Sequence, residues 1–142
     1  MTLVDSNIII YAINTSSPKH KIGQQFLQEK QKTLVLSQQN IFESIRVLTH
    51  PKFPSPMKSL DAVDAVGRIA RILNIIAPVY ETAFVAMELI KRHGLVADRI
   101  FDAYLVATML TNDITEIATD NEKDLTLFQG ITVVNPFKVS DN

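Results

Sequence analysis

Short apolar runs alternate along the chain with longer segments that have a helical repeat. The runs are rich in β-branched side chains, which is typical of buried strands. They predict strands at 2–4, 33–37, 114–118 and 131–134, with a weaker strand or a turn at 74–79.

The segments between these runs carry the spacing of amphipathic helices. In 59–73, for example, Ala62, Val66, Ile69 and Leu73 recur at intervals that place them on one helix face. The pattern predicts helices at 7–13, 21–32, 38–50, 59–73, 80–93 and 101–112.

Two of these helices have further features. The helix at 80–93 is expected to end at Gly94, because glycine is the usual residue just beyond a helix C-terminus. The segment 101–112 is apolar on most faces, which predicts a buried central helix. Three prolines make 51–56 a loop, and 119–130 reads as a polar loop.

The order of elements predicts an α/β fold. Helices separate the strands and no two-residue hairpin turn is visible, so we expect a parallel sheet with helices on both faces. In such sheets, ligands bind beyond the carboxyl ends of the strands.

Composition adds limits on function. The 142 residues fit one domain, expected at 1–137, with 138–142 as a frayed tail. The 46% apolar content is high for a small soluble monomer and suggests that a partner covers some of the surface. A net charge of −1 gives no overall basic field, so any nucleic acid would be held locally.

Cysteine is absent from the chain. Disulfides, zinc–thiolate sites and cysteine nucleophiles are therefore excluded, and a reducing compartment is compatible. We expect a cytoplasmic protein, because the sequence shows no signal peptide and no apolar run long enough to span a membrane.

Acidic and amide residues follow the predicted strands. Asp5 ends the first strand, Glu43 lies on the helix after the second, and Asp102 begins the apolar helix. The loop after the strand at 114–118 adds Asp120, Asn121 and Asp124. Because parallel strands end at one edge of the sheet, these groups are expected to converge. Converging carboxylates need cations, and oxygen ligands suit Mg²⁺ or Mn²⁺, which activate water for phosphodiester cleavage.

Four segments, taken in order, resemble the motif blocks of PIN-domain ribonucleases, and most closely those of VapC-type toxins. They are "LVDSNIIIYA", "SQQNIFESIRVLTHP", "ADRIFDAYLVATML" and "ATDNEKDLTLFQGITVVNPF", and together they cover residues 3–137. The resemblance implies a three-layer α/β/α sandwich with a central parallel sheet of four to five strands. It also implies RNA cleavage with Mg²⁺ or Mn²⁺, a homodimer, and silencing by a cognate antitoxin.

The resemblance assigns roles residue by residue. Asp5, Glu43 and Asp102 match the first three acidic positions, with Asn7 in the "D-x-N" place. The fourth block departs from the family, because Asn121 stands two residues after Thr119 where many members have aspartate.

Candidate roles follow for each position. The expected catalytic residues are Asp5, Glu43, Asp102 and Asp124, and the expected metal ligands are these four together with Asp120. Asn7, Thr119 and Asn121 are expected to support the site, and Arg46 and Arg99 to contact substrate phosphates.

Each role has a structural alternative. Asp5 can cap the helix at 7–13, and a carboxylate can cap a helix and bind a metal together. Asp98 is expected to cap the helix that holds Asp102. Asp120 and Asp124 also suit turn chemistry, and the arginines suit ion pairs with neighbouring acidic residues.

These observations favour a metal-dependent endoribonuclease that is the toxin of a VapBC-type pair. The alternative is a PIN-like module that binds RNA or protein with impaired catalysis, which the departure at Asn121 motivates. A phosphatase of the aspartyl-phosphate type is disfavoured, because it needs "D-x-D" after the first strand and the chain has "DSN".

Overall fold

A computed structural model describes residues 1–138, and residues 139–142 of the expected tail lie outside the described part. Its centre is a five-stranded, fully parallel sheet in the order β3-β2-β1-β4-β5. The strands are β1 (Thr2–Val4), β2 (Leu34–Ser37), β3 (Asn74–Ile76), β4 (Glu116–Ala118) and β5 (Thr132–Val134). The sheet confirms the α/β prediction, and the first three residues of the run at 74–79, predicted as a weak strand or a turn, form a strand.

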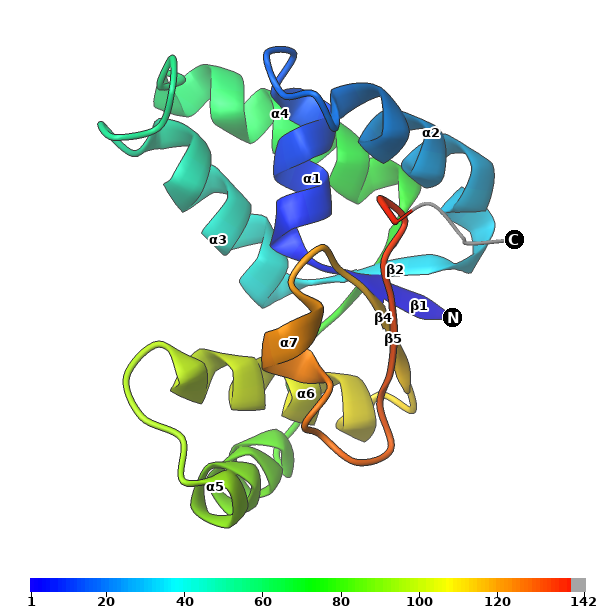
Figure 1. Ribbon diagram of the computed structural model, residues 1–142, viewed down its shortest axis with the longest axis vertical. Coiled ribbons are helices and arrows are strands. Elements are labelled where there is room, and N and C mark those ends of the chain that lie inside the picture. The colour runs from blue at the N-terminus through cyan, green and yellow to red at the C-terminus, as the bar shows by residue number, and fades with distance from the viewer. Residues whose placement is uncertain (139–142) are drawn as a thin grey trace.

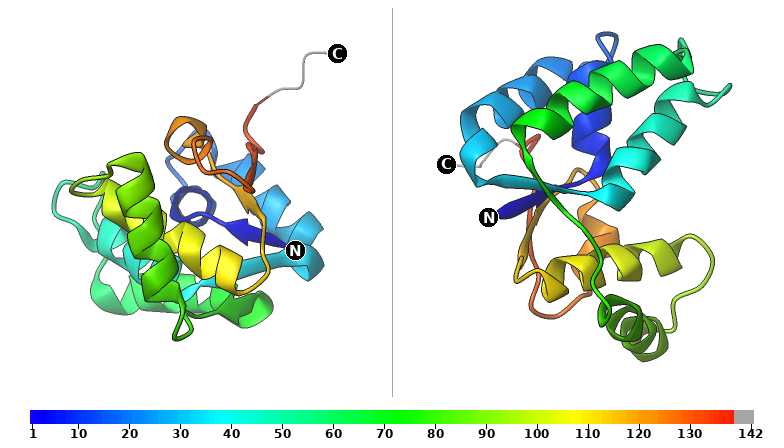
Figure 2. Two further views of the ribbon diagram at one scale, coloured as in Figure 1. Left: turned by 90° about the horizontal axis from the view of Figure 1, so that it is seen from below. Right: turned by 180° about the vertical axis from the view of Figure 1, so that it is seen from behind.

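Helices cover both faces of this sheet (Figure 1). They are α1 (Ser6–Ile13), α2 (His20–Lys30), α3 (Gln38–Thr49), α4 (Ser59–Ile72), α5 (Thr82–His93), α6 (Arg99–Thr111) and the short α7 (Glu122–Leu125). A 3₁₀ turn, η1 (Gln31–Thr33), precedes β2. Helices α1 to α4 form one layer and α5 and α6 form the other, as the view from behind in Figure 2 also shows.

The pleat of the strands divides the core between these layers. Leu3 packs with α5 and α6, whereas its neighbour Val4 packs with α1 and α4. In β4, Ile117 likewise packs with the residues of α5 and α6, and Ala118 with those of α1 and α4. Successive side chains of a strand point to opposite faces, so a fully apolar strand is buried on both sides.

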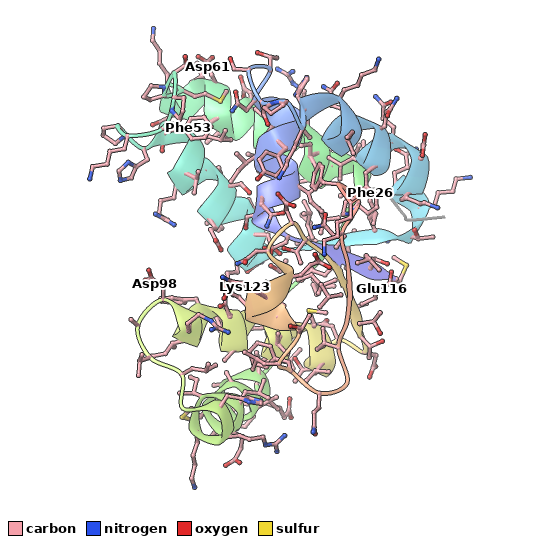
Figure 3. The ribbon with its side chains drawn as sticks, viewed as in Figure 1. Phe26, Phe53, Asp61, Asp98, Glu116 and Lys123 are labelled. Carbon is pink, nitrogen blue, oxygen red and sulfur yellow. The ribbon has the colours of Figure 1, made fainter. Side chains whose placement is uncertain are left out.

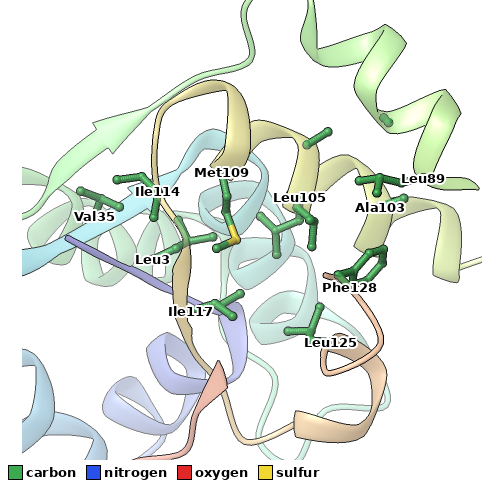
Figure 4. Packing of buried hydrophobic residues seen from close by; sticks show 13 residues of the cluster. Leu3, Val35, Leu89, Ala103, Leu105, Met109, Ile114, Ile117, Leu125 and Phe128 are labelled. Carbon is green, nitrogen blue, oxygen red and sulfur yellow. The ribbon is translucent and has the colours of Figure 1, made fainter. Parts of the chain in front are cut away.

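Helix α6 is the most buried helix of the layer that α5 and α6 form. Its residues Ala103, Val106, Ala107 and Met109 are completely buried. Figure 4 shows Met109 among the side chains of β1 and β4, with Leu125 and Phe128 closing the far side. The prediction of a buried central helix is confirmed.

Several element boundaries differ from the sequence-based expectation. Helix α6 begins at Arg99, two residues before the predicted start, so that Arg99 and Ile100 belong to its first turn. The expected polar loop 119–130 contains the one-turn helix α7. Helix α5 ends as predicted at Gly94, whose φ of 61° is left-handed.

The strand order creates a crevice at one edge of the sheet. From β1 the chain proceeds to β2 and β3 on one side, and then returns to add β4 and β5 on the other. Residues that follow β1 and β4 therefore meet where the topology reverses, which is the usual ligand position in such sheets. Within the described residues, no helix is long and apolar enough to cross a membrane.

Candidate active site

A cleft of about 800 Å³ opens at this edge of the sheet, between α3 and α6. Figure 3 shows Asp98, one of its lining residues, at the start of α6 on the side toward α3. The expected site residues that line the cleft are Asp5, Asn7, Glu43, Arg46, Arg99, Asp102, Asn121 and Asp124. Residues from four separate segments therefore meet in one cavity, as the strand order predicts.

Asp5 is held by hydrogen bonds on both carboxylate oxygens. Its Oδ1 accepts from the backbone N–H of Ser6 at 2.8 Å, which caps α1. Its Oδ2 accepts from the hydroxyl of Thr119 at 2.8 Å and, more distantly, from the amide of Asn7 at 3.5 Å. The capping role and a position in the cleft therefore coexist, because each oxygen has its own partners.

Asn7 and Thr119 hold Asp5 in place through a shared network of hydrogen bonds. The amide nitrogen of Asn7 donates to the Thr119 hydroxyl at 3.0 Å, and that hydroxyl also accepts from the N–H of Asn121 at 3.0 Å. Thr119 is completely buried, so its hydroxyl is fully committed to this network. The network joins the end of β1 to the end of β4.

A buried asparagine that sequence reasoning missed completes the support. Asn40, fully buried on α3, donates to Ser6 Oγ at 3.1 Å and to Asp5 Oδ1 at 3.4 Å. The side-chain oxygen of Asn40 accepts a hydrogen bond from the Ser37 hydroxyl at 2.6 Å. The same hydroxyl oxygen of Ser37 accepts from the backbone N–H of Asn40. The available signal was an asparagine three residues after a serine N-cap, in a position where the helix repeat otherwise calls for an apolar side chain.

The cleft disfavours the simultaneous ionisation of its carboxylates. Burial raises the pKa of Asp5 above its usual value, and the nearby charge of Asp102 raises it further, while Thr119 and Ser6 oppose the shift. Burial likewise raises the pKa of Glu43, with added repulsion from Asp5 and partial relief from Arg46. Burial is thus the main cause of both shifts, and the negative charges of neighbouring carboxylates add to it.

Arg99 pairs with two further carboxylates of the cleft, those of Asp102 and Asp124. Its Nε donates to Asp102 Oδ2 at 2.7 Å. Its Nη1 lies 3.6 Å from Asp124 Oδ1, and its Nη2 donates to the Asp124 carbonyl at 2.7 Å. The pKa of Asp102 is still raised, chiefly by burial and also by the charges of Asp124 and Asp98, against the effect of Arg99.

Asp120 is turned away from the cleft and does not line it. It pairs with Lys19 and accepts from Tyr11 Oη at 3.1 Å and from Asn135 Nδ2 at 3.2 Å. The pKa of Asp120 is lowered: burial opposes the shift, and the bonds from Lys19, Asn135 and Tyr11 outweigh it. The structure thus brings Asp124 to the cleft but not Asp120.

Asp98 and Arg46 also differ from simple expectation. Asp98 is the N-cap residue of α6, as predicted, but its side chain makes no capping hydrogen bond. Its backbone is already helical there, with φ −60° and ψ −26°, whereas residues whose side chains cap a helix have extended backbone. Arg46 lines the cleft and forms no ion pair with any described residue.

The donor chemistry of the cleft suits a hard divalent cation. Asp5, Glu43 and Asp102 supply carboxylate oxygens whose pKa values are raised, mainly by burial and to a smaller extent by repulsion from neighbouring carboxylates. Over residues 1–138, however, no three acidic or histidine side chains stand close enough together to surround one ion. Binding by all three carboxylates therefore requires their side chains to draw together.

Two exposed aromatic side chains lie beside the acidic residues. Phe42 is 69% exposed and Phe101 60% exposed, and both line the cleft. Each precedes a carboxylate in sequence, Glu43 or Asp102. The cleft therefore combines carboxylates with an apolar rim.

Comparison with known proteins agrees with this architecture. Residues 2–126 match the family model of the PIN domain. No curated protein matches the chain.

Solved structures with the same fold include toxin–antitoxin proteins. The chain is similar to FitAcB from Neisseria gonorrhoeae, with TM-score 0.73, 18% identity, and coverage of 98% of this chain and 100% of that one. It is similar to VapBC2 from Rickettsia felis bound to a promoter DNA fragment, with TM-score 0.71, 18% identity, and coverage of 94% and 97%. It is also similar to VapC20 from Mycobacterium tuberculosis, described as a sarcin–ricin loop cleaving toxin, with TM-score 0.65, 17% identity, and coverage of 82% and 87%.

Proposed function

The chain belongs to the PIN-domain family, and from that premise we propose that it is a metal-dependent endoribonuclease acting as the toxin of a VapBC-type pair. The observation that carries this proposal is the meeting of Asp5, Glu43 and Asp102 in one cleft with raised pKa values. Carboxylates arranged in this way are suited to hold Mg²⁺ or Mn²⁺.

Asp5, Glu43 and Asp102 would hold the metal, and Asp124 would complete the acidic site. When bound, the ion supplies an activated water and stabilises charge on a phosphodiester. The chain's own contribution is placement, because Thr119, Asn7 and the Ser6 N–H hold Asp5 in one orientation.

The substrate would be held by groups at the rim. Arg46 lines the cleft and has no carboxylate partner within 1–138, so its guanidinium is available to a phosphate. Phe42 and Phe101 offer exposed ring faces on which unpaired bases stack. This combination favours single-stranded or looped RNA over a regular duplex.

The similar structures support the biological role. VapC20 is described as cleaving the sarcin–ricin loop, and other neighbours are VapBC complexes. We therefore infer a cognate antitoxin as partner, a homodimer as the assembly, and a cytoplasmic location. Large apolar side chains exposed on α4 and α5, such as Leu60 at 72% and Phe84 at 54%, are consistent with surfaces that partners cover.

The decisive experiment is cleavage of a total-RNA pool by the purified chain with Mn²⁺, with Mg²⁺ and with EDTA. We expect cleavage with either ion and none with EDTA. Asp5→Asn should abolish cleavage and retain the fold, because asparagine still offers an oxygen to the Ser6 N–H. Asp61→Asn is the matched control, since Asp61 lies on α4 away from the cleft (Figure 3).

Retained cleavage in Asp5→Asn would contradict the assigned mechanism. Absence of cleavage with every ion, together with RNA binding by the purified chain, would instead favour the catalytically impaired binding module. The ends of any fragments would identify the target sequence.

A further inference from the structure

The positive charge in the cleft is distributed unevenly. Arg99 contacts Asp102 and Asp124, whereas no basic side chain forms an ion pair with Asp5 or Glu43 among residues 1–138. In one half of the acidic cleft an arginine therefore bridges the carboxylates, whereas in the other half Arg46 lies nearby without forming an ion pair among residues 1–138.

The Arg99 guanidinium makes close contacts with two acidic residues although its side chain is partly exposed. Three nitrogens take part: Nε at 2.7 Å from Asp102 Oδ2, Nη2 at 2.7 Å from the Asp124 carbonyl, and Nη1 at 3.6 Å from Asp124 Oδ1. The guanidinium is planar and remains charged at any physiological pH, so it bridges the two acidic residues as a fixed cation.

The remaining oxygen of Asp124 is also engaged. Asn121 Nδ2 donates to Asp124 Oδ2 at 2.7 Å. Both carboxylate oxygens of Asp124 thus already face nitrogen groups of the protein, while Asp102 retains only Oδ1 free of Arg99.

From this arrangement we propose that Arg99 occupies the place of a second metal ion, so that the chain binds one divalent cation rather than two. The inference rests on the proposed metal-dependent function of the same cleft. The single ion is taken up by Asp5, Glu43 and the free oxygen of Asp102. Asp124 serves Arg99 as a counter-ion and positions it beside the site.

The substitution of a guanidinium for a metal has a chemical consequence. A second ion in a nuclease site stabilises the oxygen that leaves the phosphodiester. Arg99 can donate hydrogen bonds toward such an oxygen without needing a free coordination position. Asn121 fits this arrangement, because its amide donates to Asp124 instead of adding another carboxylate to the cleft.

The test is a Mn²⁺ titration of the purified full chain without RNA, followed by isothermal calorimetry and by the electron paramagnetic resonance signal of free Mn²⁺. We expect one ion per chain for the wild type. Arg99→Gln should take up two, because Asp102 and Asp124 then face each other without a counter-charge, while the glutamine amide still offers a donor to the Asp124 carbonyl.

Two variants serve as controls. Arg46→Gln removes the same charge from the same cleft but breaks no ion pair in the described chain, so it should still bind one ion. Arg99→Lys keeps the charge and should also bind one. Thermal unfolding of each variant without metal establishes that it is folded.

The possible results separate the two proposals. Two ions in the wild type, or one ion in both the wild type and Arg99→Gln, would overturn the role of Arg99 and leave the nuclease proposal standing. Two ions in Arg46→Gln would show that the number of bound Mn²⁺ ions depends on the total positive charge of the cleft and not on the bridge from Arg99 to Asp102 and Asp124. No ion in the wild type would overturn the metal-dependent function itself.

Discussion

The hydroxyl of Thr119 donates a hydrogen bond of 2.8 Å to Oδ2 of Asp5, across 114 positions of sequence. This contact joins the residue after β4 to the residue after β1, at the point where the strand order reverses. Parallel pairing of the two strands, with Val4 opposite Ala118, puts Asp5 and Thr119 side by side. The supporting network of the cleft is thus a direct result of sheet register.

Replacing Thr119 with valine should destabilise the protein. The completely buried hydroxyl donates to Asp5 and accepts from Asn7 and Asn121, and valine would leave these groups without their partner. We expect a loss of about 1–3 kcal/mol in the free energy of unfolding.

Thr119→Ser is the matched control for this substitution. It keeps the hydroxyl and loses one methyl group, at a cost of about 0.8 kcal/mol. Urea unfolding curves measure the free energy of unfolding of both variants. An equal decrease for the valine and the serine variant would show that the hydrogen bonds of the Thr119 hydroxyl contribute little.

The stability of the metal-free protein should fall as pH rises toward neutrality through the contribution of Asp5. The pKa of Asp5 is raised in the folded state above its ordinary value of 3.8, mainly by burial. The folded state therefore binds more protons than the unfolded state, so this contribution is present below pH 3.8 and is lost as pH rises through the folded pKa.

Comparison of wild type and Asp5→Asn isolates this effect from the rest of the chain. In EDTA we expect the melting temperature of the variant, relative to wild type, to be higher at about pH 7 than at about pH 4.5. Mn²⁺ should raise the melting temperature of the wild type and not that of the variant. A difference between the two proteins that is independent of pH would refute the assignment of a raised pKa.

Asp120→Asn should leave RNA cleavage and metal uptake at wild-type levels. Asp120 lies outside the cleft, where it pairs with Lys19 and accepts from Tyr11. The Lys19 side chain is 40% exposed, so loss of this pair should lower the free energy of unfolding by at most about 1 kcal/mol. A collapse of cleavage comparable to that of Asp5→Asn would return Asp120 to the list of metal ligands.

Phe42→Ala and Phe101→Ala should weaken the binding of single-stranded RNA. Both rings are exposed in the cleft, and loss of base stacking lowers affinity by roughly 1–3 kcal/mol per base. Fluorescence anisotropy in the Asp5→Asn background measures binding without cleavage. Phe84→Ala on α5, also exposed but outside this cleft, is the control, and an equal effect there would argue against stacking at the cleft.

Much of the architecture could be predicted from the sequence, because local patterns carry it. The alternation of strands and helices predicts a parallel sheet, and Gly94 ends its helix with the expected left-handed φ. The acidic residues that follow separate strands were expected to share one edge, and Asp5, Glu43 and Asp102 do line one cleft. These conclusions need only strand ends and helix periods, which are properties of short segments.

What the tertiary structure alone decided is the direction and partner of each side chain. Asp120 and Asp124 lie in one polar segment with similar composition around them, yet Asp120 turns to Lys19 while Asp124 turns to Arg99 in the cleft. The bridge from Arg99 to two acidic residues and the buried Asn40 network likewise depend on distant segments meeting. A sequence pattern specifies which residues follow a strand, but only the packed chain determines which charges compensate one another, because that balance depends on distances between elements that are remote in sequence.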